Sequence, residues 1–257
     1  MKAHIIILMI FAMHLTSCDI FQMEEDEPMS IDMDLDGIPN TQDVCPSQAE
    51  IFNNVFDQDG CPDTPLDLYN AVRSDVEAAW NVTFQTNGLF YTPIQRFTVF
   101  SPIPQSISAC GANASSSGPF YCPIDLGIYL EDRFMLDQLN RIGDMAPAVV
   151  IAHEFGHHAQ NLLGILQGGF FSIQIELQAD CLAGAWARSA GARGLLEVGD
   201  LQEAAQTMFE IGDPAGVPWF APGAHGTSQQ RQNAFGIGFS LGSDGCFSSD
   251  FAAELES

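Results

Sequence analysis

The feature of this 257-residue sequence that most constrains its fold is the segment H-E-F-G-H, from His153 to His157. Two histidines four residues apart share a face only in a helix, where about 3.6 residues complete one turn. Apolar residues precede the motif, Pro147 suits the first turn of a helix, and Gly164 suits its end. The sequence therefore predicts a helix that begins near Pro147, ends before Gly164 and presents two imidazoles side by side.

This spacing suits a Zn2+ site. A catalytic zinc takes three protein ligands in a tetrahedral arrangement and keeps the fourth position open. His153 and His157 are the predicted ligands, and Glu154 can take a proton from a water bound by the metal. His158 lies about 140° around the helix from His153, so we interpret it as a structural residue or a support for the ligands. The motif also arises by chance on ordinary helices, so it leaves both interpretations open by itself.

A second segment, S-I-Q-I-E-L-Q-A-D-C-L-A-G-A-W-A, predicts another helix from Ser172 to Gly191. Glu176 and Asp180 lie four residues apart on it, and Glu176 is the predicted third zinc ligand. We expect Asp180 to accept a hydrogen bond from a ligand histidine and so fix its tautomer. The alternative is that both acids lie on a solvated face. Their apolar neighbours argue against that alternative, because an acid among apolar residues needs a partner.

The acidic residues are unevenly distributed along the chain. There are 33 acidic and 8 basic residues, for a net charge of -25, and residues 19–67 carry 14 of the acids and no base. So few cations cannot form the basic surface that nucleic-acid binding needs, so we expect no nucleic-acid partner. Hydrophobic residues make up 46% of the chain, which is too many for a disordered protein. The rest of the chain, residues 68–257, is therefore expected to form one folded domain.

Patterns outside the two motifs predict a mixed fold. Helices are expected over residues 68–81 and 131–142, and strands over Phe97–Phe100 and Leu126–Leu130. We expect the second strand to lie at a sheet edge, where an extended peptide can add. Together with the two motif helices, these elements predict an α+β domain.

The N-terminus predicts export. An apolar run from Ile5 to Leu15 follows Met1-Lys2, and it is too short to span a bilayer but suits a secretory signal. Its end, L-T-S-C, resembles the lipobox of bacterial lipoproteins, which implies a signal peptide over residues 1–17 and a lipid on Cys18. The predicted location is the bacterial cell envelope, periplasmic or cell-surface, with the protein anchored to a membrane by that lipid. The alternative is an ordinary secreted protein.

Six cysteines follow Cys18, an even number that suits disulfides in an oxidising compartment. The near pairs in sequence are Cys45 with Cys61 and Cys110 with Cys122, which leaves Cys181 with Cys246, but six cysteines allow 15 pairings and the sequence alone does not choose among them. For the last two residues, a pair of buried free thiols is the alternative.

The acidic segment contains a candidate calcium loop, D-M-D-L-D-G-I-P-N-T-Q-D. Positions 1, 3, 5, 9 and 12 supply oxygen ligands and position 6 is glycine. These ligands are Asp32, Asp34, Asp36, Asn40 and Asp43. The twelfth position of an EF-hand is usually Glu, and no flanking helices are evident. The segment instead resembles thrombospondin type 3 repeat linkers, which implies a stalk over residues 18–67, stiffened by Ca2+ and the Cys45–Cys61 bridge. A solvated linker that binds nothing is the alternative.

Four segments in order resemble the putative neutral zinc metallopeptidase family of bacteria. They are Ala109–Pro123, His153–Gly164, Glu176–Ala187 and His225–Arg231. The resemblance implies a zincin-like, gluzincin-type metallopeptidase domain over residues 68–257 that acts on a peptide or protein. It also implies that His153, His157 and Glu176 bind zinc and that Glu154 is the catalytic acid and base.

One position in the fourth segment has two interpretations. His225 could stabilise the negative oxygen of the transition state or could simply lie in a loop, and Tyr91, Tyr121 and Tyr129 are further candidates for the first role. The overall prediction is a membrane-anchored zinc peptidase. The alternative is a non-catalytic calcium-binding envelope lipoprotein with a peptidase-like fold, and the presence of Glu154 favours catalysis.

Overall fold

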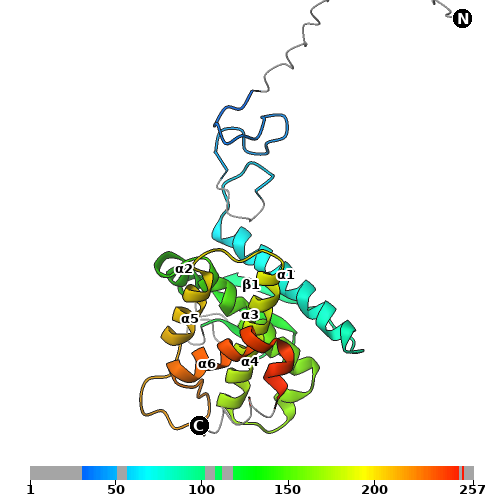
Figure 1. Ribbon diagram of the computed structural model, residues 1–257, viewed down its shortest axis with the longest axis vertical. Helices are drawn as coiled ribbons and strands as arrows, with labels where there is room; N and C mark the ends of the chain where they lie inside the picture. The colour runs from blue at the N-terminus through cyan, green and yellow to red at the C-terminus, as the bar shows by residue number, and fades with distance from the viewer. Residues whose placement is uncertain (1–30, 51–56, 102–107, 112–117, 249–250, 252–257) are drawn as a thin grey trace, which may run out of the picture.

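The computed structural model describes residues 31–50, 57–101, 108–111, 118–248 and 251. The predicted signal peptide and Cys18 lie outside these residues. Figure 1 shows a helical domain with the acidic segment extending from one end. In chain order the elements are α1 (Pro65–Thr86), β1 (Arg96–Phe100), β2 (Phe120–Cys122), β3 (Gly127–Glu131), α2 (Asp132–Arg141), α3 (Met145–Leu162), η1 (Ile165–Gln167), α4 (Ser172–Ala192), α5 (Asp200–Glu210), α6 (Ser228–Leu241) and η2 (Ser243–Phe247).

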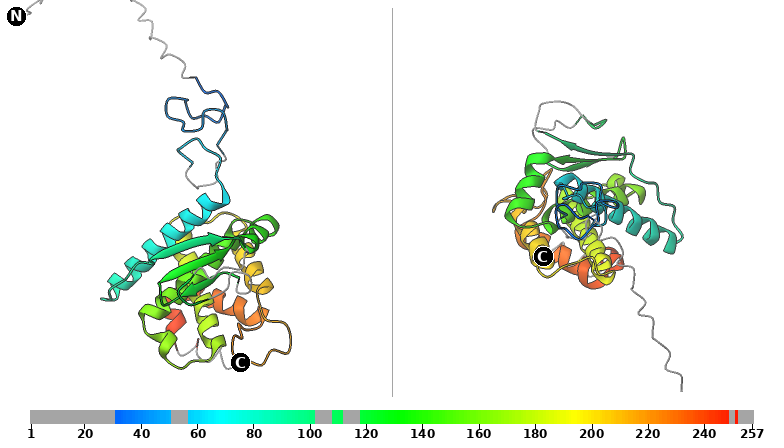
Figure 2. Two further views of the ribbon diagram at one scale, coloured as in Figure 1. Left: turned by 180° about the vertical axis from the view of Figure 1, so that it is seen from behind. Right: turned by 90° about the horizontal axis from the view of Figure 1, so that it is seen from above.

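A small mixed sheet lies along one side of the helices (Figure 2). Its order is β1-β3-β2, with β1 parallel and β2 antiparallel to β3. The prediction that Leu126–Leu130 is an edge strand is wrong, because β3 pairs on both sides. Ile128 pairs with Phe97 of β1 and with Tyr121 of β2. β2, which the sequence pattern did not predict, lies at one edge of this sheet and contacts α3 (Met145–Leu162).

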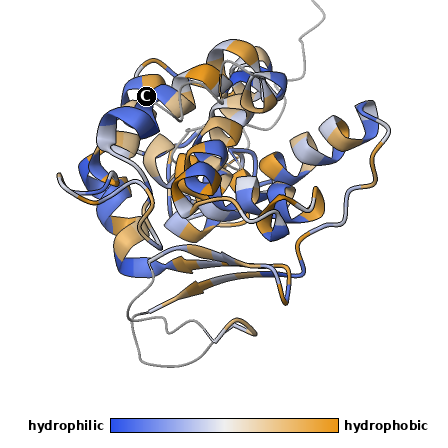
Figure 3. Cartoon of the chain, turned by 90° about the horizontal axis from the view of Figure 1, so that it is seen from below, coloured by the Kyte–Doolittle hydropathy of each residue, from blue (hydrophilic) through white to orange (hydrophobic). Residues whose placement is uncertain are grey.

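The helices carry the core, and the α+β prediction holds in the coarser sense of a mostly helical domain with a small sheet. Each predicted helix is present, with ends shifted by a few residues. The helix expected over 68–81 runs further at both ends, and its start is fixed by Pro65 in the first turn and by a capping box between Thr64 and Asp67. In Figure 3 the helices at the centre of the view carry more hydrophobic residues than those outside them. The most buried of the motif helices is α3, whose core residues include Val149, Ile151 and Phe155.

Helices α4 and α6 cross at unusually close range because glycines meet at the crossing. A Cβ atom on Gly184 would clash with the carbonyl oxygen of Phe235, and one on Gly238 would clash with that of Cys181. The missing side chains let the two backbones touch. This contact brings residues from α6 to the buried side of α4.

Three disulfides tie the described residues together. They join Cys45 to Cys61, Cys110 to Cys122 and Cys181 to Cys246. All three predicted pairings are confirmed, and the alternative of free thiols at Cys181 and Cys246 is wrong. Such bridges persist in oxidising compartments, which suggests an extracytoplasmic location. Within the described residues, none of the helices combines the length and apolar character that crossing a membrane requires.

Candidate metal centre

Two helices bring the predicted ligands together. α3 carries the H-E-F-G-H motif and α4 carries Glu176 and Asp180. The fourth residue of the motif, Gly156, faces Ala179, and a Cβ atom there would lie 3.0 Å from the Ala179 Cα. The absence of a side chain at Gly156 therefore lets α4 approach α3 next to the two histidines.

The donor atoms of this group have the spacing that zinc requires. The Nε2 atom of His153 lies 3.2 Å from Glu176 Oε2, and the Nε2 atom of His157 lies 3.5 Å from Glu176 Oε1. Tetrahedral Zn2+ with bonds of about 2.1 Å would separate two ligand atoms by about 3.4 Å. The three residues lie within a single cluster of potential metal ligands. The group can therefore supply three protein ligands to a zinc ion.

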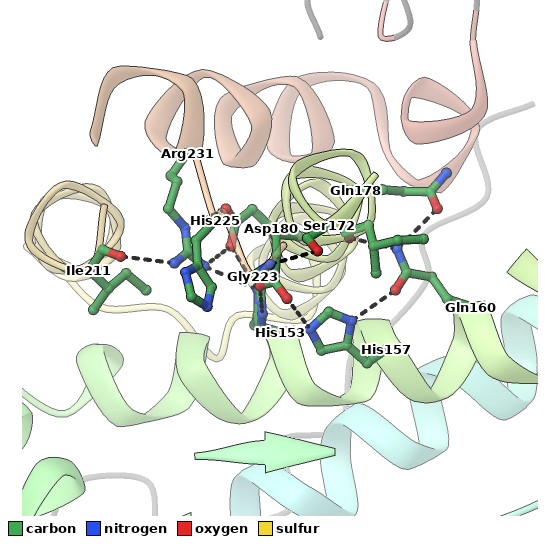
Figure 4. Close-up of polar contacts among 12 residues, drawn as sticks. His153, His157, Gln160, Ser172, Gln178, Asp180, Ile211, Gly223, His225 and Arg231 are labelled. Carbon is green, nitrogen blue, oxygen red and sulfur yellow. Dashed lines mark hydrogen bonds and ion pairs between the residues drawn. The ribbon is translucent and has the colours of Figure 1, made fainter. Parts of the chain in front are cut away.

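Both imidazoles are oriented through their other nitrogen (Figure 4). The Nδ1 atom of His153 lies 2.7 Å from Asp180 Oδ1, as the sequence predicted for Asp180. The Nδ1 atom of His157 lies 2.9 Å from Gln160 Oε1. The Gln160 amide donates to the carbonyl oxygen of Ile175 at 2.8 Å, so its Oε1 faces the histidine as an acceptor. Both rings then carry Nδ1–H and direct the Nε2 lone pair toward the ligand group.

The electrostatics of the group favour a cation among these ligands. Burial alone would lower the pKa of His153, but the carboxylates of Asp180 and Glu176 outweigh it and raise that pKa to about 10. The pKa of His157 is also raised, by Glu176 against burial. Burial opposes the charge on Glu176, yet the two histidines hold its pKa well below the usual range. The pocket thus stabilises positive charge beside Glu176, which a divalent metal can supply in place of protons.

Glu154 differs from the ligands in having an unsatisfied oxygen. Its side chain is buried, and Oε2 has neither solvent exposure nor a hydrogen-bond partner within the described part of the chain. Burial raises the pKa of this carboxyl, while the neighbouring His153 and His157 act in the opposite direction. A buried carboxylate oxygen without a partner is costly, so it indicates a ligand or a proton at this position.

Sequence reasoning missed two residues of the site, Gln160 and Arg231. Both are buried, and Arg231 reaches from α6 to form an ion pair with Asp180 at 2.7 Å. For Arg231, one signal was available in the sequence. It is a cation in a helix whose following residues include Ala234, Phe235 and Ile237, and a buried cation requires an acidic partner. No comparable signal distinguishes Gln160 from a glutamine on a helix surface.

A cleft of about 620 Å³ opens at the ligand group. Residues of β2, α2, α3 and α4 line it, as do Leu166 of η1 and His225. His225 lies in the loop between α5 and α6, with its side chain 49% exposed and its Nδ1 atom 3.2 Å from Asp213 Oδ1. His225 therefore lies in a loop, as one of its two interpretations expected. It also lines the cleft, as the other interpretation requires.

Two of the three candidate tyrosine hydroxyls, those of Tyr121 and Tyr129, have hydrogen-bond partners, whereas the Tyr91 hydroxyl has none among the described residues. The Tyr121 hydroxyl lies 2.9 Å from Nδ1 of His158, and Tyr129 donates to Asp125. Tyr91 is buried in the core, where its ring packs against His158. His158 is itself fully buried, with Nε2 2.7 Å from the carbonyl oxygen of Thr92. These contacts support the structural interpretation of His158.

Comparison with known proteins agrees with this geometry. The model of the family described as "Putative neutral zinc metallopeptidase" matches residues 29–248. The chain belongs to this metallopeptidase family. The match covers the four segments that resemble the family in sequence, together with all of the described acidic segment.

Relatives within the metallopeptidase family include proteins named only as uncharacterized. YpfJ of Escherichia coli K12 is 34% identical over 233 residues, which cover 82% of this chain and 78% of YpfJ. Rv2575 of Mycobacterium tuberculosis H37Rv is 35% identical over 176 residues, which cover 58% of this chain and 60% of that protein. No solved structure gives a significant match to the chain. The family name thus supports zinc and peptidase chemistry, and the relatives' names add no substrate.

Proposed function

We propose that this protein is a zinc-dependent peptidase that hydrolyses peptide bonds with Glu154 as the catalytic acid and base. The observation that supports the proposal best is the buried, unpartnered Oε2 of Glu154 next to a three-donor group with zinc-like spacing. A zinc site without catalytic function has no need of an unsatisfied carboxylate at its open side.

The residues divide the chemistry among them. His153, His157 and Glu176 would hold zinc, which supplies Lewis acidity for the carbonyl under attack. Glu154 would take the proton of the attacking water and return it to the leaving amine. Its raised pKa brings the carboxyl closer to the operating pH, where proton transfer in both directions is efficient. His225 is exposed to the cleft and is the candidate for stabilising the developing negative oxygen.

The substrate of the proposed reaction is an extended peptide segment. β2 is an edge strand whose Phe120 and Tyr121 line the cleft that contains Glu154. A peptide that pairs with this edge would satisfy its own backbone groups and lie across the ligand group. β2, and not Leu126–Leu130, is thus the edge strand to which the peptide is proposed to add.

The proposed peptidase should lose its activity with its metal. We expect the purified protein to contain about one zinc per chain, because a single group of potential ligands among the described residues contains the histidines that zinc favours. Treatment with a chelator should abolish cleavage of casein or a peptide library, and Zn2+ should restore it, whereas Mg2+ should not. Metal analysis and fluorescence-based cleavage assays measure both quantities. Protein that cleaves equally well after its zinc has been removed would contradict the proposal.

We also propose that the acidic segment binds Ca2+. Both carboxylate oxygens of Asp34 lack solvent exposure and a hydrogen-bond partner among the described residues, and Asp43 Oδ2 is in the same situation. Burial, and then the like charge of Asp36, raise the pKa of Asp34. Asp32, Asp34 and Asp36 form a compact group of potential ligands. Asn40 Oδ1 accepts a hydrogen bond from the Met33 amide, and the two carboxylate oxygens of Asp32 accept from the amides of Leu35 and Gly37.

The calcium proposal predicts heat of binding in a titration of the zinc-loaded full-length protein with Ca2+. Asp34→Asn should weaken binding by about tenfold or more, because it removes a charged ligand from a site that depends on ligand charge. Asp244→Asn is the matched control, since Asp244 is exposed on the catalytic domain. Equal titration curves for wild type and Asp34→Asn would contradict a calcium site at this loop.

Anchoring through a lipid on Cys18 completes the proposal and places the domain on a stalk at a membrane surface.

A further inference from the structure

We infer that Arg231 is a positioning residue for the metal ligand His153. Its guanidinium group fixes the Asp180 carboxylate, which in turn holds the imidazole so that Nε2 faces the metal. The inference rests on the proposed function in one respect, since it takes His153, His157 and Glu176 as a metal site.

The contacts between Arg231 and Asp180 leave the carboxylate little freedom. Arg231 Nε donates to Oδ2 at 2.8 Å and Nη2 donates to Oδ1 at 2.7 Å. This is the parallel, two-bond arrangement in which a guanidinium fixes the plane of a carboxylate. Oδ1 also accepts from His153 Nδ1, so one oxygen joins the arginine to the imidazole. The plane of Asp180 therefore sets the direction of the hydrogen bond to His153.

Arg231 is itself held in place from a second side. Its Nη1 donates to the carbonyl oxygen of Ile211, the residue that follows α5, at 3.0 Å. Arg231 is 3% exposed and Asp180 is 0% exposed, so water cannot replace either partner. Loss of the arginine would leave Asp180 as a buried charge with only His153 beside it. The carboxylate would then either rotate or move, and the imidazole would follow it.

The two ligand histidines, His153 and His157, are oriented by groups that differ in charge. His157 is oriented by Gln160, a neutral group held by the Ile175 carbonyl and by Gln178 of the adjacent helix α4. His153 is oriented by a charged group that needs a cation, and that cation comes from α6. Helix α6 thus contributes to the metal site without supplying a ligand, and the glycine crossing at Gly184 and Gly238 brings it close enough to do so.

Zinc release tests this role directly. We expect Arg231→Met to release zinc to a chelator about 10- to 100-fold faster than wild type, because loss of the groups that orient a ligand histidine lowers metal affinity by about that factor and the weaker binding should show in the release rate. Arg231→Lys keeps the charge but cannot form two parallel hydrogen bonds with the carboxylate. Its zinc release rate should therefore lie between those of wild type and Arg231→Met. Arg188→Met is the matched control. Arg188 also joins α4 to α6, through the carbonyl oxygens of Phe239 and Ser240, and it does not contact Asp180.

A second measurement separates positioning from general stability. In the zinc-loaded protein, the Nδ1 proton of His153 should give a deshielded proton NMR signal that is lost or shifted in Arg231→Met and kept in Arg188→Met. If the Met variant does not fold, the Lys variant decides the question by the same two measurements. Wild-type release rates and an unchanged signal in the folded Arg231 variants would overturn the inference. Wild-type protein that binds no zinc would instead overturn the proposed function.

Discussion

Replacement of Glu154 by glutamine should leave the protein with about one zinc per chain and lower its rate of peptide cleavage by about 10²- to 10⁴-fold, the usual contribution of a positioned acid and base. Glutamine has nearly the same shape as glutamate but cannot accept the proton of the attacking water. The zinc should stay because Glu154 is not part of the ligand group of His153, His157 and Glu176. Metal analysis and initial rates of casein or peptide-library cleavage measure the two effects separately.

A second carboxylate in the same cleft provides the matched control. Glu210 also lines the cleft, forms an ion pair with Arg141 at 2.8 Å and is not a member of the ligand group. Glu210→Gln removes one negative charge from the cleft as Glu154→Gln does, but it should keep measurable cleavage. Equal loss in both variants would mean that charge in the cleft, and not proton transfer at Glu154, limits the reaction. Wild-type cleavage by Glu154→Gln would exclude Glu154 as the base, whereas absence of cleavage by the zinc-loaded wild-type protein would favour the non-catalytic alternative.

The sequence identified the ligand group because its signal is local. Helical spacing alone relates His153 to His157 and Glu176 to Asp180, and flanking apolar residues indicate which faces are buried. Helical spacing does not show that the pair on α3 contacts the pair on α4. The contact depends on Gly156, which occupies a variable position of the motif. The need for glycine there becomes evident only in the structure, where Ala179 packs against it.

Residues that act across several elements escaped prediction for the same reason. Arg231 is 51 positions from Asp180 in the chain, and Gln160 acts by an amide orientation that the Ile175 carbonyl determines. Gly184 and Gly238 have a low helix propensity, so in the sequence they argue against a helix at their positions. In the structure they are the residues that let α4 and α6 cross closely. The place of β3 in the middle of the sheet depended on β2, which has only three residues and lies between Pro119 and Pro123.

The Cys181–Cys246 disulfide closes the longest loop of the three bridges and should contribute strongly to the stability of the domain. It connects α4 to η2 across 65 residues of sequence, and both cysteines are fully buried. Closing a loop of that length lowers the entropy of the unfolded chain enough to stabilise the folded state by about 4 kcal/mol in the chain-entropy treatment. That is a large part of the roughly 5–15 kcal/mol by which native domains are stable.

We therefore expect Cys181→Ala/Cys246→Ala to lower the melting temperature by roughly 8–16 °C, since 1 kcal/mol corresponds to about 2–4 °C in a domain of this size. Calorimetry on metal-free protein avoids the additional stabilisation that bound zinc provides. Opening the Cys45–Cys61 bridge, which closes only 16 residues before α1, is the control. It should change the domain's transition far less if the acidic segment and the domain unfold separately. An unchanged transition without Cys181 and Cys246 would show that packing between α4, α6 and η2 holds the unit together without the bridge.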